Sequence, residues 1–177
     1  MTAPLIPRVI GLDLSLAATG IARPDGHTER VTCGDLLGTD RLAWICSAVM
    51  GHARDSVDLV VVEGPSYGNM SGAGHHEAAG LWWLIAYTLD GADIPYAIAP
   101  PATLKKYATG RGNATKPDMR MALFQRTGLD IRDDNQADAW WLRAAGLHHL
   151  GHPIVDLPAA QQAALDKVSW PEVVGRG

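Results

Sequence analysis

The sequence predicts a mixed α/β fold, with a sheet started by the first third of the chain and helices added around it. Three observations indicate this: three short apolar stretches in a row near the N-terminus, a nearly all-apolar stretch at residues 57–65 between two helical patterns, and four more helical patterns after residue 100. The order strand, strand, strand, helix, strand, helix, strand, then helices is typical of a mixed α/β layer fold. A length of 177 residues suits one domain with a sizeable core.

Five stretches are expected to form strands. The first three lie at residues 8–15, 19–24 and 29–37 with turn residues between them, so we expect a meander. The stretch at 57–65 is nearly all apolar, as in a strand buried on both faces, and Glu63 stands at its end. Residues 94–100 form the fifth predicted strand.

Helices are predicted where apolar residues recur at helical spacing between capping signals. Residues 39–55 begin at a candidate cap, Thr39, and residues 75–91 follow a glycine-rich loop and end at Gly91. Further helices are predicted at 101–108, 116–128, 133–151 and, in the tail, 157–168. Thr115 caps the helix that Gly128 ends, and Asp133 caps the next one, with Gln136 expected to complete a capping box.

Composition limits the class of protein. The chain is 47% hydrophobic and 19% charged, which indicates a globular protein. Its net charge of −4 disfavours a purely electrostatic nucleic-acid binder and leaves local basic patches open. Cys33 and Cys46 lack the spacing of a disulfide framework or a zinc site, which favours a reduced, cytoplasmic setting. The N-terminus does not resemble a secretion signal, and the most apolar stretch, residues 81–89, is too short to span a bilayer.

Three acidic residues come from three different predicted elements. Asp13 lies near the end of the first strand, Glu63 at the end of the fourth, and Asp138 in the last long helix, where Asp134 and Asn135 share its face. Taken singly, each acid is more simply a cap or a surface residue, but Asp13 is inside a strand, where it cannot cap a helix. Three carboxylates from separate elements are typical of a metal site, and all-oxygen ligands favour Mg²⁺ or Mn²⁺.

A basic segment follows the fifth strand. Between residues 105 and 126, six basic residues stand against one acid, Asp118, around the glycine-containing sequence at 110–116. The basic residues are Lys105, Lys106, Arg111, Lys116, Arg120 and Arg126. Backbone amides before a helix N-terminus suit a phosphate group, while a solvated helix face remains the alternative.

The helix at 76–90 is apolar on nearly every side from Leu81 to Tyr87, more than one core face requires. We therefore expect it to contact a second subunit, through Leu81, Trp82 and Ile85. The tryptophans Trp82, Trp83, Trp140 and Trp141 are expected in the core or at that interface. His75 and His76 are expected to be exposed at the start of this helix.

Four segments in order resemble one family: VIGLDLSLAATGIA, LVVVEGP, LKKYATGRGNATK and DNQADAWWL. Together they resemble the RuvC-type Holliday-junction resolvases of the RNase H-like superfamily, most of all the small members encoded by bacteriophages. The resemblance implies an RNase H-like domain at residues 1–152, with a five-stranded mixed sheet, three antiparallel strands first and then parallel ones, flanked by helices. Residues 153–177 would be a C-terminal tail with a short helix.

The resemblance also implies a function. A homodimer would nick two opposing strands of a four-way DNA junction, with two Mg²⁺ ions per site and no nucleotide cofactor, in DNA recombination, repair or phage DNA processing. Asp13, Glu63 and Asp138 match the family's metal ligands, and Lys105 and Lys116 match its two lysines, Lys116 with a catalytic role. Mn²⁺ would be a substitute ion, and the place of action would be the cytoplasm, that of a bacterial host if a phage encodes the chain.

Two positions depart from the family pattern. Asn135 stands where the family often has a fourth acidic or histidine ligand, so Asn135 and Asp134 both remain candidates. Ser66 stands where relatives carry an aromatic residue that inserts into the junction, and Tyr67 is the nearest aromatic. With Tyr67, the expected DNA-binding residues are Lys105, Lys106, Arg111, Lys116 and Arg120.

Other functions stay open on the sequence. A related nuclease acting on RNA or on other branched DNA would carry the same acids. A junction-binding module without activity would fit Asn135. An actin-like kinase or ATPase is disfavoured, because that class needs two such domains and a second phosphate-binding loop.

Overall fold

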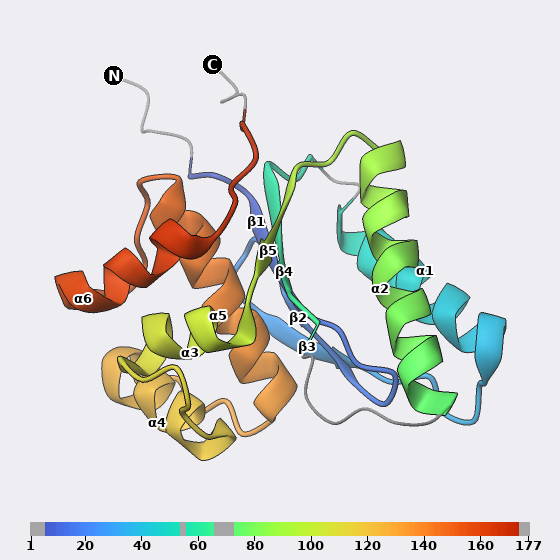
Figure 1. Cartoon of the computed structure of the whole chain (residues 1–177), viewed down its shortest axis with the longest axis horizontal. Helices are drawn as coiled ribbons and strands as arrows, with labels where there is room; N and C mark the ends of the chain where they lie inside the picture. Colours follow the sequence, from blue (N-terminus) through green and yellow to red (C-terminus); the bar gives the residue numbers. More distant parts are fainter. Residues whose placement is uncertain (1–5, 54–55, 66–72, 174–177) are drawn as a thin grey trace.

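A five-stranded sheet lies at the centre of the computed structural model, which describes residues 6–53, 56–65 and 73–173 (Figure 1). Its strand order is β3-β2-β1-β4-β5. The strands are β1 (Val9–Asp13), β2 (Thr19–Ala22), β3 (Thr28–Val31), β4 (Leu59–Glu63) and β5 (Tyr96–Ala99). The first three strands pair antiparallel, whereas β4 pairs parallel with both β1 and β5. The predicted five-stranded mixed sheet is confirmed.

Helices cover both faces of this sheet (Figure 1). On one face lie α1 (Gly38–Ala53) and α2 (Ala73–Gly91). On the other lie α3 (Pro101–Thr109), α4 (Lys116–Thr127), α5 (Asp134–His149), α6 (Ala159–Gln162) and the short 3-10 helix η1 (Ala163–Lys167). None of the helices in the described ranges combines the length and the apolar character needed to cross a membrane.

Alternation along the central strands gives each face its own core. In β1, Ile10 and Leu12 pack toward α1 and α2, whereas Val9 packs toward α5. Because successive side chains of a strand point to opposite faces, Gly11 and Asp13 belong to the α5 face. The same alternation in β4 puts Leu59 and Val61 on the α5 face, and therefore also Glu63.

Glycines bring α5 unusually close to the sheet. A Cβ atom at Gly11 would lie 2.0 Å from the carbonyl oxygen of Ala139, and one at Gly20 would lie 2.0 Å from that of Asn135. At Gly146, on the helix side, a Cβ would lie 2.7 Å from side chains of Val9 and Val61. Because these three glycines have no side chain, α5 can pack this close to β1, β2 and β4, and larger residues there would push it away.

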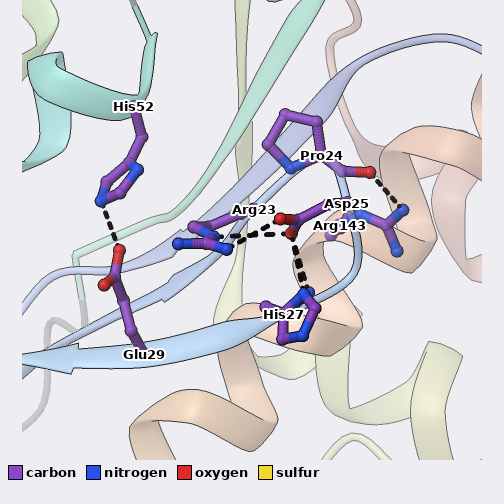
Figure 2. A network of polar contacts seen from close by, with 7 residues as sticks. All are labelled: Arg23, Pro24, Asp25, His27, Glu29, His52 and Arg143. Carbon is purple, nitrogen blue, oxygen red and sulfur yellow. Dashed lines mark hydrogen bonds and ion pairs between the residues drawn. The ribbon is translucent and has the colours of Figure 1, made fainter.

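Polar contacts hold the β2–β3 turn at the far end of the sheet (Figure 2). Asp25 accepts from Arg23 at 2.7 Å and from the backbone amide of His27 at 3.0 Å, and these bonds lower the pKa of Asp25 to about 2. From α5, the Arg143 guanidinium donates to the carbonyl oxygen of Pro24 at 2.9 Å. Nearby, the His52 ring contacts Glu29 and so joins α1 to β3.

Several local expectations need correction. Helix α1 begins at Gly38, so Thr39 lies inside it, and the Gly38 amide donates to a carboxylate oxygen of Glu77 on α2. Asp133 does cap α5, but the Gln136 side chain accepts from Thr28 of β3 instead of completing a capping box. The third strand covers only Thr28–Val31, and the tail helix becomes α6 followed by η1.

The prediction that Leu81 and Ile85 contact a second subunit is wrong as well. Leu81 and Ile85 are each 1% exposed, because they belong to the core between α2 and the sheet. The exposed aromatic residues of α2 are Trp83 and Tyr87, at 69% and 78%. Trp140 and Trp141 are core residues as expected.

Candidate active site

Asp13 and Glu63 lie side by side at the carboxyl ends of β1 and β4. These strands are parallel, and their register pairs Leu12 with Val62, so the next residues along are Asp13 and Glu63. Both side chains point to the α5 face of the sheet, and they hydrogen-bond to one another. The parallel register therefore creates the carboxyl pair that the sequence predicted from two strand ends.

Asp138 joins this pair from α5. It is buried, and it lies next in sequence to Ala139, the residue whose carbonyl oxygen sits against Gly11 of β1. Its charge acts directly on Glu63, and that of Asp13 acts on Asp138. The glycine contact of the helix thus delivers the third carboxyl group to the ends of the two strands.

The three carboxyl groups have raised pKa values. Burial, which disfavours the charged form, is the main cause for each. The pKa of Asp13 rises to about 6 and that of Asp138 to about 7. The pKa of Glu63 rises to about 8, because the charges of Asp13 and Asp138 and its hydrogen bond to Asp13 add to burial. Raised pKa values of three neighbouring carboxyl groups mean that the site favours added positive charge.

The positive charges of two lysines, Lys105 on α3 and Lys116 on α4, lower the pKa values of these carboxyl groups. Lys116, the first residue of α4, lowers the pKa values of Asp13 and Asp138. Lys105, on α3, lowers those of Glu63 and Asp138. These are the two lysines of the basic segment that match the lysines of the resembled family, and their charges act on the carboxyl groups from two different helices.

The two candidates for a fourth ligand have different surroundings. Asp134 forms a close ion pair with Arg120, 3.0 Å from Asp134 Oδ1 to Arg120 Nε, although the N–H is not aligned for a hydrogen bond. The amide nitrogen of Asn135 donates to the carbonyl oxygen of Ala18 at 2.6 Å, which ties the start of α5 to the loop after β1. The charge of Asp134 raises the pKa values of Asp13 and Asp138, so Asp134 belongs to the electrostatic surroundings of the site.

Other basic residues of the predicted DNA-binding set have protein partners. Arg120 also donates to the carbonyl oxygen of Arg132 at 2.7 Å, and Arg111 lies 3.2 Å from a carboxylate oxygen of Asp118. Arg126, counted in the basic segment, donates to the carbonyl oxygen of Asp156 and so fastens α4 to the tail. Lys106 is exposed. Tyr67 lies outside the described residues.

The residues present suit a hard cation by their chemistry. Within residues 6–53, 56–65 and 73–173, no three His, Cys, Asp or Glu side chains are already arranged as a metal cage. The cluster nevertheless combines two buried carboxyl groups, Asp13 and Asp138, with the half-buried Glu63; oxygen is the only donor atom, and each group has a raised pKa. Such a donor set fits Mg²⁺ or Mn²⁺ and does not fit zinc, which prefers sulfur and nitrogen.

Sequence analysis missed how the loop after Asp13 is fixed. The buried Thr19 hydroxyl donates to the carbonyl oxygen of Ser15 at 2.9 Å, and the Ser15 hydroxyl accepts from the amides of Ala17 and Ala18. Ser and Thr at a strand end are a signal for such turns, and it was present at these positions. This turn holds the backbone that follows Asp13 in one conformation.

Comparison with known proteins shows what the fold resembles. The chain matches no protein-family model and no curated protein. Among solved structures, it is similar to RuvC of Thermus thermophilus, with a TM-score of 0.65 and 19% identity, over 84% of this chain and 99% of that one. It is also similar to T. thermophilus RuvC in complex with a Holliday junction substrate, with a TM-score of 0.68 and 18% identity, over 85% of this chain and 99% of that one. At these identities, the likeness shows a shared fold.

Proposed function

We propose that this chain is a metal-dependent endonuclease of the RuvC type that cleaves four-way DNA junctions. The observation that carries the proposal is the meeting of Asp13, Glu63 and Asp138 at one end of the sheet, with Lys105 and Lys116 beside them. The similar T. thermophilus RuvC structure holds a Holliday junction, which supports this class of substrate. The four sequence segments supply independent support, and their likeness to phage-encoded members suggests action in a bacterial host.

The carboxyl groups would hold the metal. Asp13, Glu63 and Asp138 are the proposed ligands of two Mg²⁺ ions, with Asp134 or Asn135 as the further oxygen ligand. Bound there, such ions activate a water and stabilise the leaving oxygen of a phosphodiester. Burial contributes as well, because the electrostatic interactions of the carboxyl groups are stronger away from bulk water.

The lysines would act on the phosphate. Lys116 is exposed at the start of a helix, where the backbone also favours an anion, and its charge reaches Asp13 and Asp138. We assign it the stabilisation of the additional negative charge that develops on the phosphate during hydrolysis. Lys105 has the same role toward the side of Glu63. Arg111 and Lys106, farther along the basic segment, would contact backbone phosphates of the junction arms.

A substrate comparison tests the proposed function. The purified chain is incubated with a synthetic four-way junction, a flap, a linear duplex and an RNA–DNA hybrid of matched sequence, with Mg²⁺ and with EDTA. We expect Mg²⁺-dependent nicks in the four-way junction and little cleavage of the linear duplex. Preferred cleavage of the hybrid would show an RNA-directed nuclease instead, and tight junction binding without any cleavage would show a binding module.

A further inference from the structure

A cavity of about 590 Å³ lies at the end of the sheet opposite the carboxyl groups, where β1 begins and β2 ends. Its walls come from the segment before β1, the β2–β3 turn, the end of α1, α5 and the loop after α5. Three arginines line it, Arg8, Arg23 and Arg143, against one carboxylate, that of Asp25. The cavity therefore combines the volume of a small-molecule site with an excess of positive charge.

Arg143 is a buried cation, 7% exposed, whose charge has no direct partner among the described residues. Its guanidinium donates to the carbonyl oxygen of Pro24 at 2.9 Å (Figure 2), but its Nε has no hydrogen-bond partner in the described part of the chain. The charge of Asp25 acts on Arg143, yet Asp25 forms its ion pair with Arg23 instead. Because a buried charge is costly unless it is paired, Arg143 favours an added anion in this cavity.

Arg23 is a second guanidinium on the wall of this cavity, and it is held in place. Its Nε and Nη2 donate to the two carboxylate oxygens of Asp25, at 3.4 and 2.7 Å (Figure 2). The amide of His27 donates to the same carboxylate at 3.0 Å, so the turn itself fixes Asp25. Arg23 is thus positioned before any ligand arrives, which reduces the cost of ordering its side chain on binding.

We propose that this cavity binds a small phosphate compound through Arg143 and Arg23. A guanidinium presents its N–H donors in a planar fork that fits the oxygens of a phosphate, and burial strengthens such charge-assisted bonds. Pro7, Pro24 and Ile154 add apolar wall for an organic part of the ligand. The cavity lies apart from the candidate active site, so this inference does not rest on the proposed function.

Protection by inorganic phosphate tests this inference. Thermal unfolding of the wild type is measured in EDTA at constant pH and ionic strength, while sodium chloride is replaced stepwise by sodium phosphate. We expect the unfolding midpoint to rise by at least about 2 °C and then to level off, because a ligand that binds only the folded state stabilises it. A general salt effect would instead rise without levelling off and would be the same in every variant.

Arginine variants locate the bound phosphate. Arg143→Met removes the buried charge and keeps an apolar side chain, so the saturating rise should disappear. Arg132→Met is the matched control, because Arg132 is exposed, pairs with Asp130 and lies outside the cavity; its rise should equal that of wild type. A merely structural role of Arg143 would lower the midpoint equally in both salts and leave the rise in place. Arg23→Gln should need at least about tenfold more phosphate for half of the rise.

The inference is overturned if wild type shows no saturating rise, or if Arg143→Met keeps it, because the phosphate then binds elsewhere. If Arg143→Met does not fold, Arg23→Gln decides, and a rise at wild-type phosphate concentrations would contradict the inference. Junction-binding titrations at several salt concentrations test the source of the phosphate. We expect Arg143→Met to match wild type in them, whereas a salt dependence lower by about one ion would show a DNA phosphate in place of a small compound.

Discussion

Asp13 is an acidic residue in a strand whose other members are apolar or glycine, and its surroundings explain why. It is buried, hydrogen-bonds to Glu63 and feels the charges of Lys116, Asp133 and Asp134. A buried carboxylate is costly unless it is paired or binds a metal. Asp13 therefore lowers the stability of the metal-free protein, and its carboxyl group is suited to binding a cation.

The free-energy cost of burying these carboxyl groups increases as pH rises and they lose their protons. Asp13, Glu63 and Asp138 have raised pKa values in the folded protein, so between pH 4 and pH 8 the folded state binds more protons than the unfolded state. The unfolding free energy must then fall as pH rises through this window. In EDTA, we expect Glu63→Gln to be more stable than wild type by on the order of 2 kcal/mol at pH 8.5, and by much less at pH 5. Thermal unfolding at the two pH values measures this, and a wild type that becomes more stable as pH rises would contradict it.

Lys116 and Arg111 are expected to differ in role. Lys116 acts on the carboxyl groups, whereas Arg111 is exposed and pairs only with Asp118 among the described residues. Lys116→Ala should lower the cleavage rate about 100-fold with little change in junction affinity, because it removes charge beside the scissile phosphate. Arg111→Ala should weaken binding and reduce its salt dependence by about one ion. Single-turnover cleavage rates and junction-binding titrations at several salt concentrations measure both effects. If the two variants weaken binding equally and neither changes the cleavage rate, Lys116 only contacts a phosphate.

At this scale two of the acids could be predicted from local position, because Asp13 and Glu63 are charged residues at the ends of apolar strands. Asp138, Lys105 and Lys116 were predicted together with them because the four segments resemble one family. The sequence did not identify their side-chain partners. The pairing of Asp134 with Arg120 and the use of the Asn135 amide on Ala18 depend on how α4 and the loop after β1 approach α5. No local pattern records such contacts between distant segments.

At the scale of elements, α5 is the part that assembles the site, and glycines set its position. Its N-terminus, Asp133 cap and Asp138 are placed over β1 and β2 by the close approach at Gly11 and Gly20. Sequence patterns predicted the helix and its cap, because both are local. They did not predict the shortened third strand or the start of α1, where Glu77 from another helix binds the first amide.

A glycine pair tests this packing. Gly11→Ala places a Cβ against the backbone of Ala139 and Arg143, which cannot yield without moving α5, so we expect a loss of stability of at least about 3 kcal/mol. The control is Gly51→Ala in α1, where no atom lies within 4 Å of the added Cβ; it should stabilise the protein by about 0.5–1 kcal/mol. Urea unfolding measures both, and an unchanged midpoint for Gly11→Ala would show that α5 is not held in this way.

At the scale of the whole molecule, resolving a four-way junction requires two related cuts, and a symmetric dimer supplies two related sites. The apolar surplus of α2 suggested such a dimer, but Leu81 and Ile85 serve the core. Periodicity could not separate a core face from an interface, because both are apolar. Trp82, the third expected interface residue, is half-buried against the core between α2 and the sheet. With Trp82, the exposed Trp83 and Tyr87, four residues apart on α2, are the remaining candidates for a subunit contact.

Matched charge substitutions on α2 distinguish the two faces. Trp83→Glu with Tyr87→Glu should leave the fold intact and give monomers that make uncoupled nicks. Leu81→Glu should instead unfold the chain, because it buries a charge in the core. Sedimentation velocity with and without junction DNA, together with thermal unfolding, measures these outcomes. A wild type that is monomeric even on the junction would contradict the dimer.

The central claim is that Asp13, Glu63 and Asp138 form one catalytic metal site. The most direct measurement is the single-turnover cleavage rate of Asp13→Asn, Glu63→Gln and Asp138→Asn on a four-way junction in Mg²⁺, with junction affinity measured in parallel. Each substitution removes charge and keeps shape, so we expect each rate to fall by at least about 1000-fold, with affinity within about threefold of wild type. If any one of the three variants cleaves at close to the wild-type rate, that residue is not part of the site and the account is contradicted.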